Sequence, residues 1–429
     1  MGEKQLWDLG LKSIQDLETE NGILASAKEE IYGCIFGRDS IITALTLLNV
    51  YEKTKNEYFL SLVTKVLVSL SQLQGTRVTL ESGEEPGKCI HEFRPTNHER
   101  LTGNLIEPWY VYPDNILRNY DSVDATPLFL ILFAEYFRVS NDRAFIEQYK
   151  PNIMAALNWV LEYGDSDGDG FIDYTFHATR THGGLKTQSW MDSDESRFFE
   201  KGDEKPEYPI APVEVQAYAF TALYMWSQLL VDSDLAYAQQ LMERARNLKV
   251  QFNQVFVMRA GGRVTLAYAV DGQGRRLTSA RSSMGHCLWA VARDEGGRLV
   301  SVLEEQYIPQ IVHRLLSPDM FVSKGGVRTL SSRSRHFDPV SYHNGSIWPH
   351  DTAILAQGLE NFGYTQEAKE VRRALVFAYA HFKTPIELFG YLKGKYREYV
   401  SPHGGGACRT QAWSAASLLT ATLEVLDRP

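Results

Sequence analysis

Residues 212–230 read PVEVQAYAFTALYMWSQLL and are apolar on nearly every side of a helix. The segment that follows at 236–252, AYAQQLMERARNLKVQF, is polar on one side only. A helix that is apolar all round has to be buried, whereas a one-sided helix covers a core. The two segments therefore predict an inner helix followed by an outer helix.

The same alternation recurs at helical spacing along the whole chain. One-sided segments predict outer helices near 3–20, 57–74, 143–163, 234–257, 296–315 and 365–382. Segments that are apolar nearly all round predict inner helices near 39–52, 121–137, 212–230, 281–293, 348–363 and 410–425. Six of each in strict alternation describe an all-α fold, the (α/α)6 barrel or six-hairpin toroid, whose loops into the inner helices open on one face. The strand-like stretches RVTLAYAV (263–270) and KCIHEF (88–93) are too few for a parallel sheet and are expected as minor β-hairpin insertions.

Composition and charge narrow the class of protein. We expect a single domain, 1–429, because no linker rich in Pro, Gly or Ser divides the chain and 44% hydrophobic residues suffice for a sizeable core. The net charge of -9 argues against nucleic acid and anionic membrane surfaces as partners. No segment approaches the roughly 18 apolar residues of a membrane span, and the start of the chain does not read as a secretory signal. Four widely spaced cysteines are typical of reduced thiols, so we expect a cytoplasmic protein, whose oligomeric state stays open.

Trp, His and carboxylate residues gather just before the predicted inner helices. The loops contain FGRDS (36–40), YDSVDATP (120–127), QSWMDS (188–193), SYHNGSIWPHD (341–351) and ACRTQAWS (407–414). Each motif alone is also typical of helix capping, but together, on one face of a toroid, they predict a site.

The chemistry of that site follows from the residue types. No GxGxxG, P-loop, HExxH or GxSxG pattern occurs, so we expect neither a cofactor nor a catalytic metal. A Trp beside a carboxyl group desolvates it and raises its pKa, which suits a general acid. Glycoside hydrolysis needs two carboxyl groups, roughly 6.5–9.5 Å apart in an inverting enzyme, and opposite walls of a toroid mouth supply that separation. The predicted partner is a carbohydrate substrate.

The motifs also run in a recognisable order, from FGRDSIITALTLL through YDSVDATPLFLILFAEY, GLKTQSWMDS and SYHNGSIWPHDTAILAQGL to ELFG and TQAWSAAS. In this order the chain resembles the amylo-α-1,6-glucosidases, the glycogen-debranching type of glycoside hydrolase, and more distantly the glucoamylases. The resemblance covers almost the whole chain after the first predicted helix. It implies an (α/α)6 barrel and an inverting, exo-acting enzyme that releases glucose from α-glucosidic oligosaccharides or α-1,6 branches.

The resemblance also implies the catalytic pair. Asp192 in SWMDS matches the general acid of the family, and Glu387 in TPIELFG matches its general base. Because Ile386 stands where the family usually has Pro, and the stretch after it departs from the usual Pro-rich loop, Glu398 in KYREYV is the alternative base.

Further residues are expected to bind the substrate. Arg38 and Asp39 match the pair that grips hydroxyls of the terminal sugar, although an adjacent Arg and Asp is also typical of a structural ion pair. The other candidates for the wall of the site are Trp190, Glu214, His343, Asn344, Trp348, His350, Asp351 and Trp413.

Three alternatives stay open at the level of sequence. One alternative is that the toroid hydrolyses a different glycoside, such as a disaccharide, a glucosylated solute or a sucrose-like substrate. Another is that the protein binds sugar and has lost hydrolysis. Asp165, Asp167 and Asp169 begin either a calcium loop or a tight solvated turn, since an EF-hand would need Glu at its twelfth position, where Phe176 stands.

Overall fold

Helices α7 (Val213–Leu229) and α8 (Leu235–Val255) form the predicted inner and outer pair in the computed structural model, which describes residues 2–103, 106–401 and 405–425. Every residue of α7 from Val213 to Leu223 is buried, whereas α8 buries one side only. Asp234 starts α8 by accepting a hydrogen bond from the N–H of Tyr237 at 3.0 Å, as an N-cap does.

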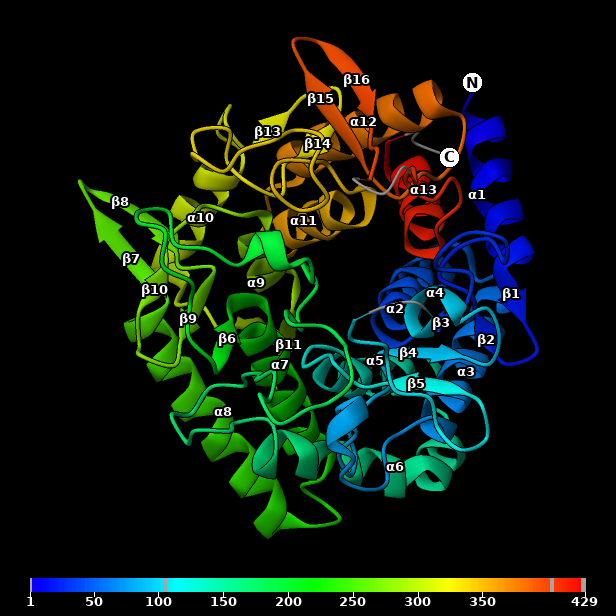
Figure 1. Cartoon of the computed structure of the whole chain (residues 1–429), viewed down its shortest axis with the longest axis vertical. Helices are drawn as coiled ribbons and strands as arrows, with labels where there is room; N and C mark the ends of the chain where they lie inside the picture. The colour runs from blue at the N-terminus through cyan, green and yellow to red at the C-terminus, as the bar shows by residue number, and fades with distance from the viewer. Residues whose placement is uncertain (1, 104–105, 402–404, 426–429) are drawn as a thin grey trace.

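The inner helices form a closed ring (Figure 1). Around the ring α2 packs on α5, α5 on α7, α7 on α9, α9 on α11, α11 on α13, and α13 on α2 again. The inner segments are α2 (Gly37–Thr54), α5 (Ala125–Ser140), α7, η3 with α9 (Ser282–Trp289), α11 (Pro349–Asn361) and α13 (Ala412–Val425).

A second set of helices covers the outside of this ring (Figure 1). The outer helices are α1 (Glu3–Leu17), α3 (Glu57–Gln72), α6 (Arg143–Glu162), α8, α10 (Ile308–Leu315) and α12 (Thr365–Phe382). Helix α1 packs against α13, so the two ends of the described chain lie together. The predicted (α/α)6 toroid is confirmed.

One hairpin of the toroid differs from the sequence prediction. The inner segment expected over 281–293 is a 3₁₀ turn, η3 (Ser282–Gly285), followed by a single helical turn, α9 (His286–Trp289). The outer helix expected over 296–315 begins only at Ile308. Both predictions were therefore wrong in length, although the two segments keep their inner and outer places.

A β-hairpin occupies the missing helical length. Strands β11 (Val291–Arg293) and β12 (Leu299–Ser301) pair antiparallel across a turn in which Asp294 accepts hydrogen bonds from the N–H groups of Gly296 and Arg298. Side chains of Asp compete with helical hydrogen bonding in this way and favour turns.

The remaining strands are short and lie in the loops. Every strand pair among the described residues is antiparallel, and the two largest sheets have the orders β3-β4-β5 and β10-β9-β6. The stretch RVTLAYAV divides between β8 and β9, while only the end of KCIHEF belongs to a strand, β4. The strands are β1 (Glu18–Thr19), β2 (Gly22–Ile23), β3 (Ile35–Phe36), β4 (Glu92–Arg94), β5 (Leu117–Asn119), β6 (Ile210–Pro212), β7 (Val257–Ala260), β8 (Arg263–Leu266), β9 (Ala269–Asp271), β10 (Arg276–Leu277), β13 (Phe321–Val322), β14 (Gly326–Val327), β15 (Phe389–Leu392) and β16 (Lys395–Glu398).

The hydrophobic core fills the space between the rings. Phe129 of α5, Phe220 of α7 and Phe252 of α8 are at most 1% exposed. Burying an aromatic or aliphatic side chain of this size contributes about 1.5–3 kcal/mol to folding. The four cysteines are buried and unbridged, and no helix in the described ranges has both the length and the apolar character needed to cross a lipid bilayer.

Candidate active site

A pocket of about 220 Å³ lies where the inner helices begin. Its wall comes from the first turn of α2, the strand β4, the loops before α11 and α13, and the loop at 188–193. Eight of the residues predicted from the sequence line it, namely Arg38, Asp39, Trp190, Asp192, His343, Trp348, Glu387 and Trp413.

Close packing at Gly37 sets the position of the first wall. A Cβ at this residue would lie 1.9 Å from the carbonyl oxygen of Ile90, so only glycine allows strand β3 to run beside β4 and turn directly into α2. Arg38 and Asp39 then occupy the first helical turn, at the mouth of the ring.

Arg38 makes a buried ion pair, but not with its neighbour in sequence. Its Nε donates to Asp124 Oδ2 at 2.6 Å, its Nη1 donates to Asp192 Oδ2 at 3.1 Å, and its Nη2 donates to the carbonyl oxygen of Ser189 at 2.9 Å. The Arg38 and Asp124 side chains are 2% and 0% exposed. Arg38 therefore fixes the loop that carries Asp192, and Asp124 is a partner that the sequence analysis did not identify.

Asp192 faces the pocket with 24% of its side chain exposed. Burial raises the pKa of its carboxyl group to about 6, and the nearby Arg38 guanidinium opposes this shift. A carboxyl group in this range holds its proton in part of the molecules near neutral pH. This property suits a general acid.

Glu387 lies in the same pocket, 1% exposed, and its two carboxylate oxygens have separate donors. The Tyr342 hydroxyl donates to Oε1 at 2.6 Å, and the N–H of Cys408 donates to Oε2 at 2.7 Å. Burial raises the pKa of Glu387 to about 7, while these hydrogen bonds favour the charged form and lower it. The group is thus oriented and poised to gain or lose a proton near neutral pH.

Asp39 provides a third carboxyl group. Burial raises its pKa to about 8; the Arg38 charge lowers it, and the charges of Asp192 and Glu387 raise it further. The three carboxyl groups are therefore close enough for the charges of Asp192 and Glu387 to affect the pKa of Asp39. No ion pair joins Asp39 to Arg38 among the described residues, so the structural alternative for this pair is not what the geometry shows.

Aromatic rings form the rest of the wall. His343 stacks on Trp348, with ring centroids 5.1 Å apart, and Trp190 meets both rings edge-on. Nδ1 of His343 lies 2.9 Å from Oγ of Ser193, next to the proposed acid. Burial and the neighbouring arginine charges hold the pKa of His343 well below its usual range, so its imidazole is neutral.

Four predicted residues do not line the pocket: Glu214, Asn344, His350 and Asp351. Asn344 bridges two loops, since its Oδ1 accepts from Arg281 Nη2 at 2.8 Å and its Nδ2 donates to the carbonyl oxygen of Glu195 at 2.8 Å. It supports the wall from behind.

The other three lie in the first turns of α7 and α11 and are buried. His350 stacks on Trp413 with centroids 3.7 Å apart. Asp351 Oδ1 lies 2.9 Å from His286 Nε2, and both side chains are fully buried. Burial raises the pKa of Glu214 to about 7, and its Oε2 has no hydrogen-bond partner in the described part of the chain.

Several lining residues were missed by the sequence analysis. Tyr342 lies inside the quoted motif SYHNGSIWPHD, and its place beside His343 was the available signal. Tyr32, Trp109 and Arg100 belong to stretches without a recognised motif, and Arg100 comes from the short helix α4 (Glu99–Thr102). No local pattern in these stretches indicates that their loops fold over the pocket.

The alternative base is not part of the pocket. Glu398 ends strand β16, 66% of its side chain is exposed, and it pairs with Arg409 at 3.1 Å. Part of the stretch between it and the last inner helix, residues 402–404, lies outside the described residues.

The acidic turn after α6 is held by its own hydrogen bonds. Carboxylate oxygens of Asp165, Asp167 and Asp173 lie within 4.8 Å of one another. Asp169 is not in this group; its carboxylate accepts from the N–H of Phe171 at 2.8 Å. The calcium loop at Asp165, Asp167 and Asp169 stays a prediction.

The sequence model described as "Mannosylglycerate hydrolase MGH1-like glycoside hydrolase domain" matches residues 118–414. No curated protein matches the chain in a sequence comparison.

Solved structures similar to the chain are glycosidases. The GH63 mannosylglycerate hydrolase from Thermus thermophilus, in complex with Tris, has a TM-score of 0.64 and 15% identity, covering 97% of this chain and 99% of that chain. Its complex with glucose has a TM-score of 0.63, 14% identity and the same coverage. A wild-type glycosidase has a TM-score of 0.59 and 13% identity, covering 100% of this chain and 98% of that chain. At these identities the similarity shows the fold alone.

Proposed function

Since the chain belongs to the family of mannosylglycerate hydrolase MGH1-like glycoside hydrolase domains, we propose that its pocket hydrolyses a glycosidic bond with Asp192 as general acid and Glu387 as general base. A glycoside hydrolase was expected from the sequence, and the family match confirms this. The glycogen-debranching type stays a prediction.

One observation supports the proposal most. Asp192 and Glu387 line the same small pocket but are held by unlike partners. Asp192 shares the Arg38 guanidinium with Asp124, while Glu387 accepts hydrogen bonds from Tyr342 and Cys408. Two carboxyl groups in different environments are what acid and base roles require.

The chemistry follows from these two positions. Asp192 donates its proton to the oxygen of the leaving group as the glycosidic bond breaks. Glu387 accepts a proton from a water molecule, which attacks the anomeric carbon from the opposite face and inverts its configuration. After release of both products, Glu387 releases its proton to solvent and Asp192 takes up a proton from solvent, which restores both groups.

The pocket also supports binding of a single terminal sugar. Asp39 offers a carboxyl group to sugar hydroxyls, and Trp190, Trp348 and Trp413 offer flat apolar faces. Its volume of about 220 Å³ is below the roughly 300–1,000 Å³ of typical ligand pockets. We therefore propose an exo-acting enzyme with a small glycoside as its substrate, rather than a branched polymer.

A small acidic aglycone fits the rim of this pocket. Arg100 lines the pocket, is exposed, and makes no ion pair with any described residue. The other rim arginine, Arg94, already pairs with Glu92 at 2.5 Å. A similar solved structure, the mannosylglycerate hydrolase from Thermus thermophilus, is in complex with Tris and D-glycerate. We propose a glycoside of glycerate or a similar hydroxy acid, cleaved into the sugar and the free acid.

Product analysis by proton NMR tests the proposal. The panel contains mannosylglycerate, glucosylglycerate, α-linked glucose oligosaccharides, isomaltose and sucrose. We expect an α-glycoside of glycerate to react fastest and to release the β-anomer of its sugar first. Initial release of the α-anomer would contradict inversion, and preference for isomaltose would favour the debranching type. Ligand binding without product, unchanged in Glu387→Gln, would identify a sugar-binding protein instead.

A further inference from the structure

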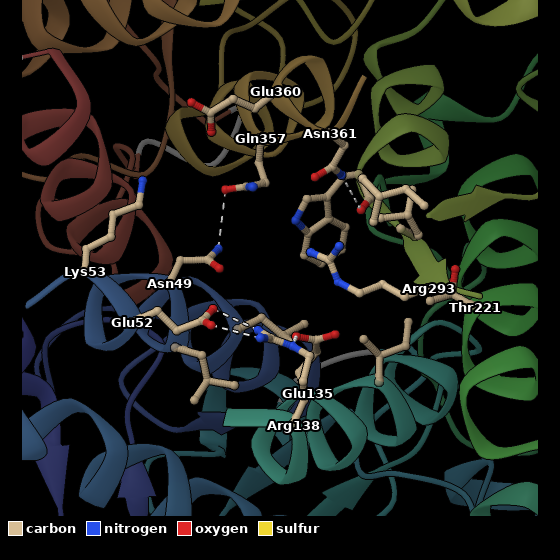
Figure 2. A pocket seen from close by; sticks show the side chains of 17 residues that line it. Asn49, Glu52, Lys53, Glu135, Arg138, Thr221, Arg293, Gln357, Glu360 and Asn361 are labelled. Carbon is tan, nitrogen blue, oxygen red and sulfur yellow. Dashed lines mark hydrogen bonds and ion pairs between the residues drawn. The ribbon is translucent and has the colours of Figure 1, made fainter. Parts of the chain in front are cut away.

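A second cavity, of about 470 Å³, lies at the opposite end of the inner ring from the proposed active site. Helices α2 and α11 begin at the active pocket and end at this cavity, which the last turns of α2, α5 and α11 surround as an opening (Figure 2). The volume is within the roughly 300–1,000 Å³ of ligand pockets.

Most of the charged groups around this cavity are already in ion pairs; among the described residues Arg293 is the exception, and its charge lowers the pKa of the nearby Glu52 carboxyl group. Glu52 receives two hydrogen bonds of 2.8 Å from Arg138, which also donates to Glu135 at 2.7 Å (Figure 2). Glu360 receives two from Arg372, at 2.8 and 2.6 Å. A ligand with a strong charge would have to compete with these pairs, so the lining favours a neutral ligand. Paired carboxylates of this kind are also unsuited to acid and base catalysis.

Uncharged polar side chains around the cavity, by contrast, have hydrogen-bond donors and acceptors that are not used within the described residues. Asn49 Nδ2 donates to Gln357 Oε1 at 3.4 Å, which leaves Asn49 Oδ1 and Gln357 Nε2 without a partner among the described residues (Figure 2). The Thr221 hydroxyl lines the same cavity, is buried, and makes no hydrogen bond within the described ranges. Buried hydroxyl groups in folded proteins are almost always hydrogen-bonded, so this one indicates a ligand or an ordered water molecule.

An aromatic ring completes the lining. The Trp289 side chain is partly exposed to the cavity and packs edge-on against Tyr218, with ring centroids 6.0 Å apart. Asn361 Nδ2 fixes the backbone at this point by donating to the carbonyl oxygens of Leu288 and Trp289, both at 3.1 Å. The indole is therefore held in a defined orientation.

We propose that this cavity is a second carbohydrate-binding site, which takes a neutral sugar ring or polyol and performs no hydrolysis. A sugar has C–H faces that pack on an indole and hydroxyl groups that both donate and accept hydrogen bonds. Those hydroxyls match the free acceptor of Asn49, the free donors of Gln357 and the hydroxyl of Thr221. The ligand is either a free monosaccharide or the end unit of an oligosaccharide.

NMR of the protein with ¹⁵N-labelled tryptophan tests this site without relying on catalysis. Trp289→Phe identifies the indole resonance of Trp289, and D-glucose and maltotriose are the probes. We expect that resonance to shift and saturate. Thr221→Val and Gln357→Leu should each weaken binding at this site by about 5-fold, the effect of one lost hydrogen bond. Tighter binding of maltotriose than of glucose would indicate a chain end, and the reverse a free sugar.

Thr54→Val is the matched control, because Thr54 lies on α2 outside the cavity and its hydroxyl already donates to the carbonyl oxygen of Val50 at 2.8 Å. Its affinity should equal that of the wild type. A Trp289 resonance that neither probe moves, or wild-type affinity in both Thr221→Val and Gln357→Leu, would overturn the proposal. If Trp289→Phe does not fold, crystals of the wild type soaked in D-glucose decide: a sugar in the cavity supports the proposal, and water alone overturns it.

Discussion

The hydroxyl of Tyr342 donates a 2.6 Å hydrogen bond to Oε1 of Glu387. The same hydroxyl lies 3.0 Å from that of Tyr32, while the backbone of Cys408 holds the other carboxylate oxygen. Glu387 is thus fixed in direction, and its charged form is stabilised inside a buried pocket. Tyr342 is a positioning residue for the proposed base.

Removal of this hydroxyl should change the pH dependence of the reaction. In Tyr342→Phe the pKa of Glu387 should rise above its present value of about 7, because a hydrogen bond that favours the charged form is lost. The base works only when ionised, so the pH of maximal activity should move to a higher value, with kcat at neutral pH falling about 10-fold. A profile that superimposes on that of the wild type would show that Tyr342 does not position the base. Tyr32→Phe, one hydroxyl further away, should have a smaller effect.

The wild-type enzyme should have a bell-shaped pH profile. Burial raises the pKa of Asp192 to about 6 and that of Glu387 to about 7. Activity requires a protonated Asp192 and an ionised Glu387, so it is lost at high pH as the acid loses its proton and at low pH as the base gains one. We expect kcat/KM to be greatest between pH 6 and 7, with two apparent values that belong to the pair. Activity that keeps rising into alkaline solution would contradict the assigned acid.

The ion pair of Arg38 should be important for stability. Arg38→Met leaves the buried Asp124 carboxylate without its partner, and breaking a buried pair in this way costs about 3–5 kcal/mol of unfolding free energy. Urea unfolding followed by circular dichroism measures the loss. The exposed pair of Lys12 and Asp16 gives the control, since Lys12→Met should leave the unfolding midpoint almost unchanged. Equal midpoints for Arg38→Met and the wild type would refute the structural role of the pair.

The choice between two candidate bases also has a direct test. Glu398 is exposed and paired with Arg409, so Glu398→Gln should keep turnover within about 2-fold of the wild type. Measurement of kcat for Glu398→Gln and Glu387→Gln side by side distinguishes the two residues. A large loss in Glu398→Gln alone would move the role of base to the β15–β16 hairpin.

Local periodicity predicted most of the toroid because the inner helices are apolar on all sides, whereas the outer helices are apolar on one side only. Helix α7 is the plain case, with apolar residues on all sides and no polar face to mistake. The prediction failed at 281–293, where an apolar run continued into strand β11 and a turn at Asp294. A short apolar run does not distinguish a buried helix from a buried strand.

Only those site residues that stand in a recognisable local motif could be predicted from the sequence. Asp192 and Glu387 stand in recognisable segments, and both line the pocket. The pairing of Arg38 with Asp124 joins residues 86 positions apart, so no local pattern indicates it. Glu214 lies in a loop-to-helix motif like the others, but the packing of the ring, which the sequence does not specify locally, places it outside the pocket lining.

The most direct test of the assigned acid and base compares the kcat of each variant on two substrates that have different leaving groups. One is the glycoside that the wild type hydrolyses, and the other is the glycosyl fluoride of the same sugar, whose leaving group departs without a proton. We expect Asp192→Asn to lose about 10²–10⁴-fold in kcat on the glycoside and to recover most of it on the fluoride. Glu387→Gln should be slow on both, because water still needs its base. Equal losses for Asp192→Asn on the two substrates, or full activity of Glu387→Gln, would contradict the assignment.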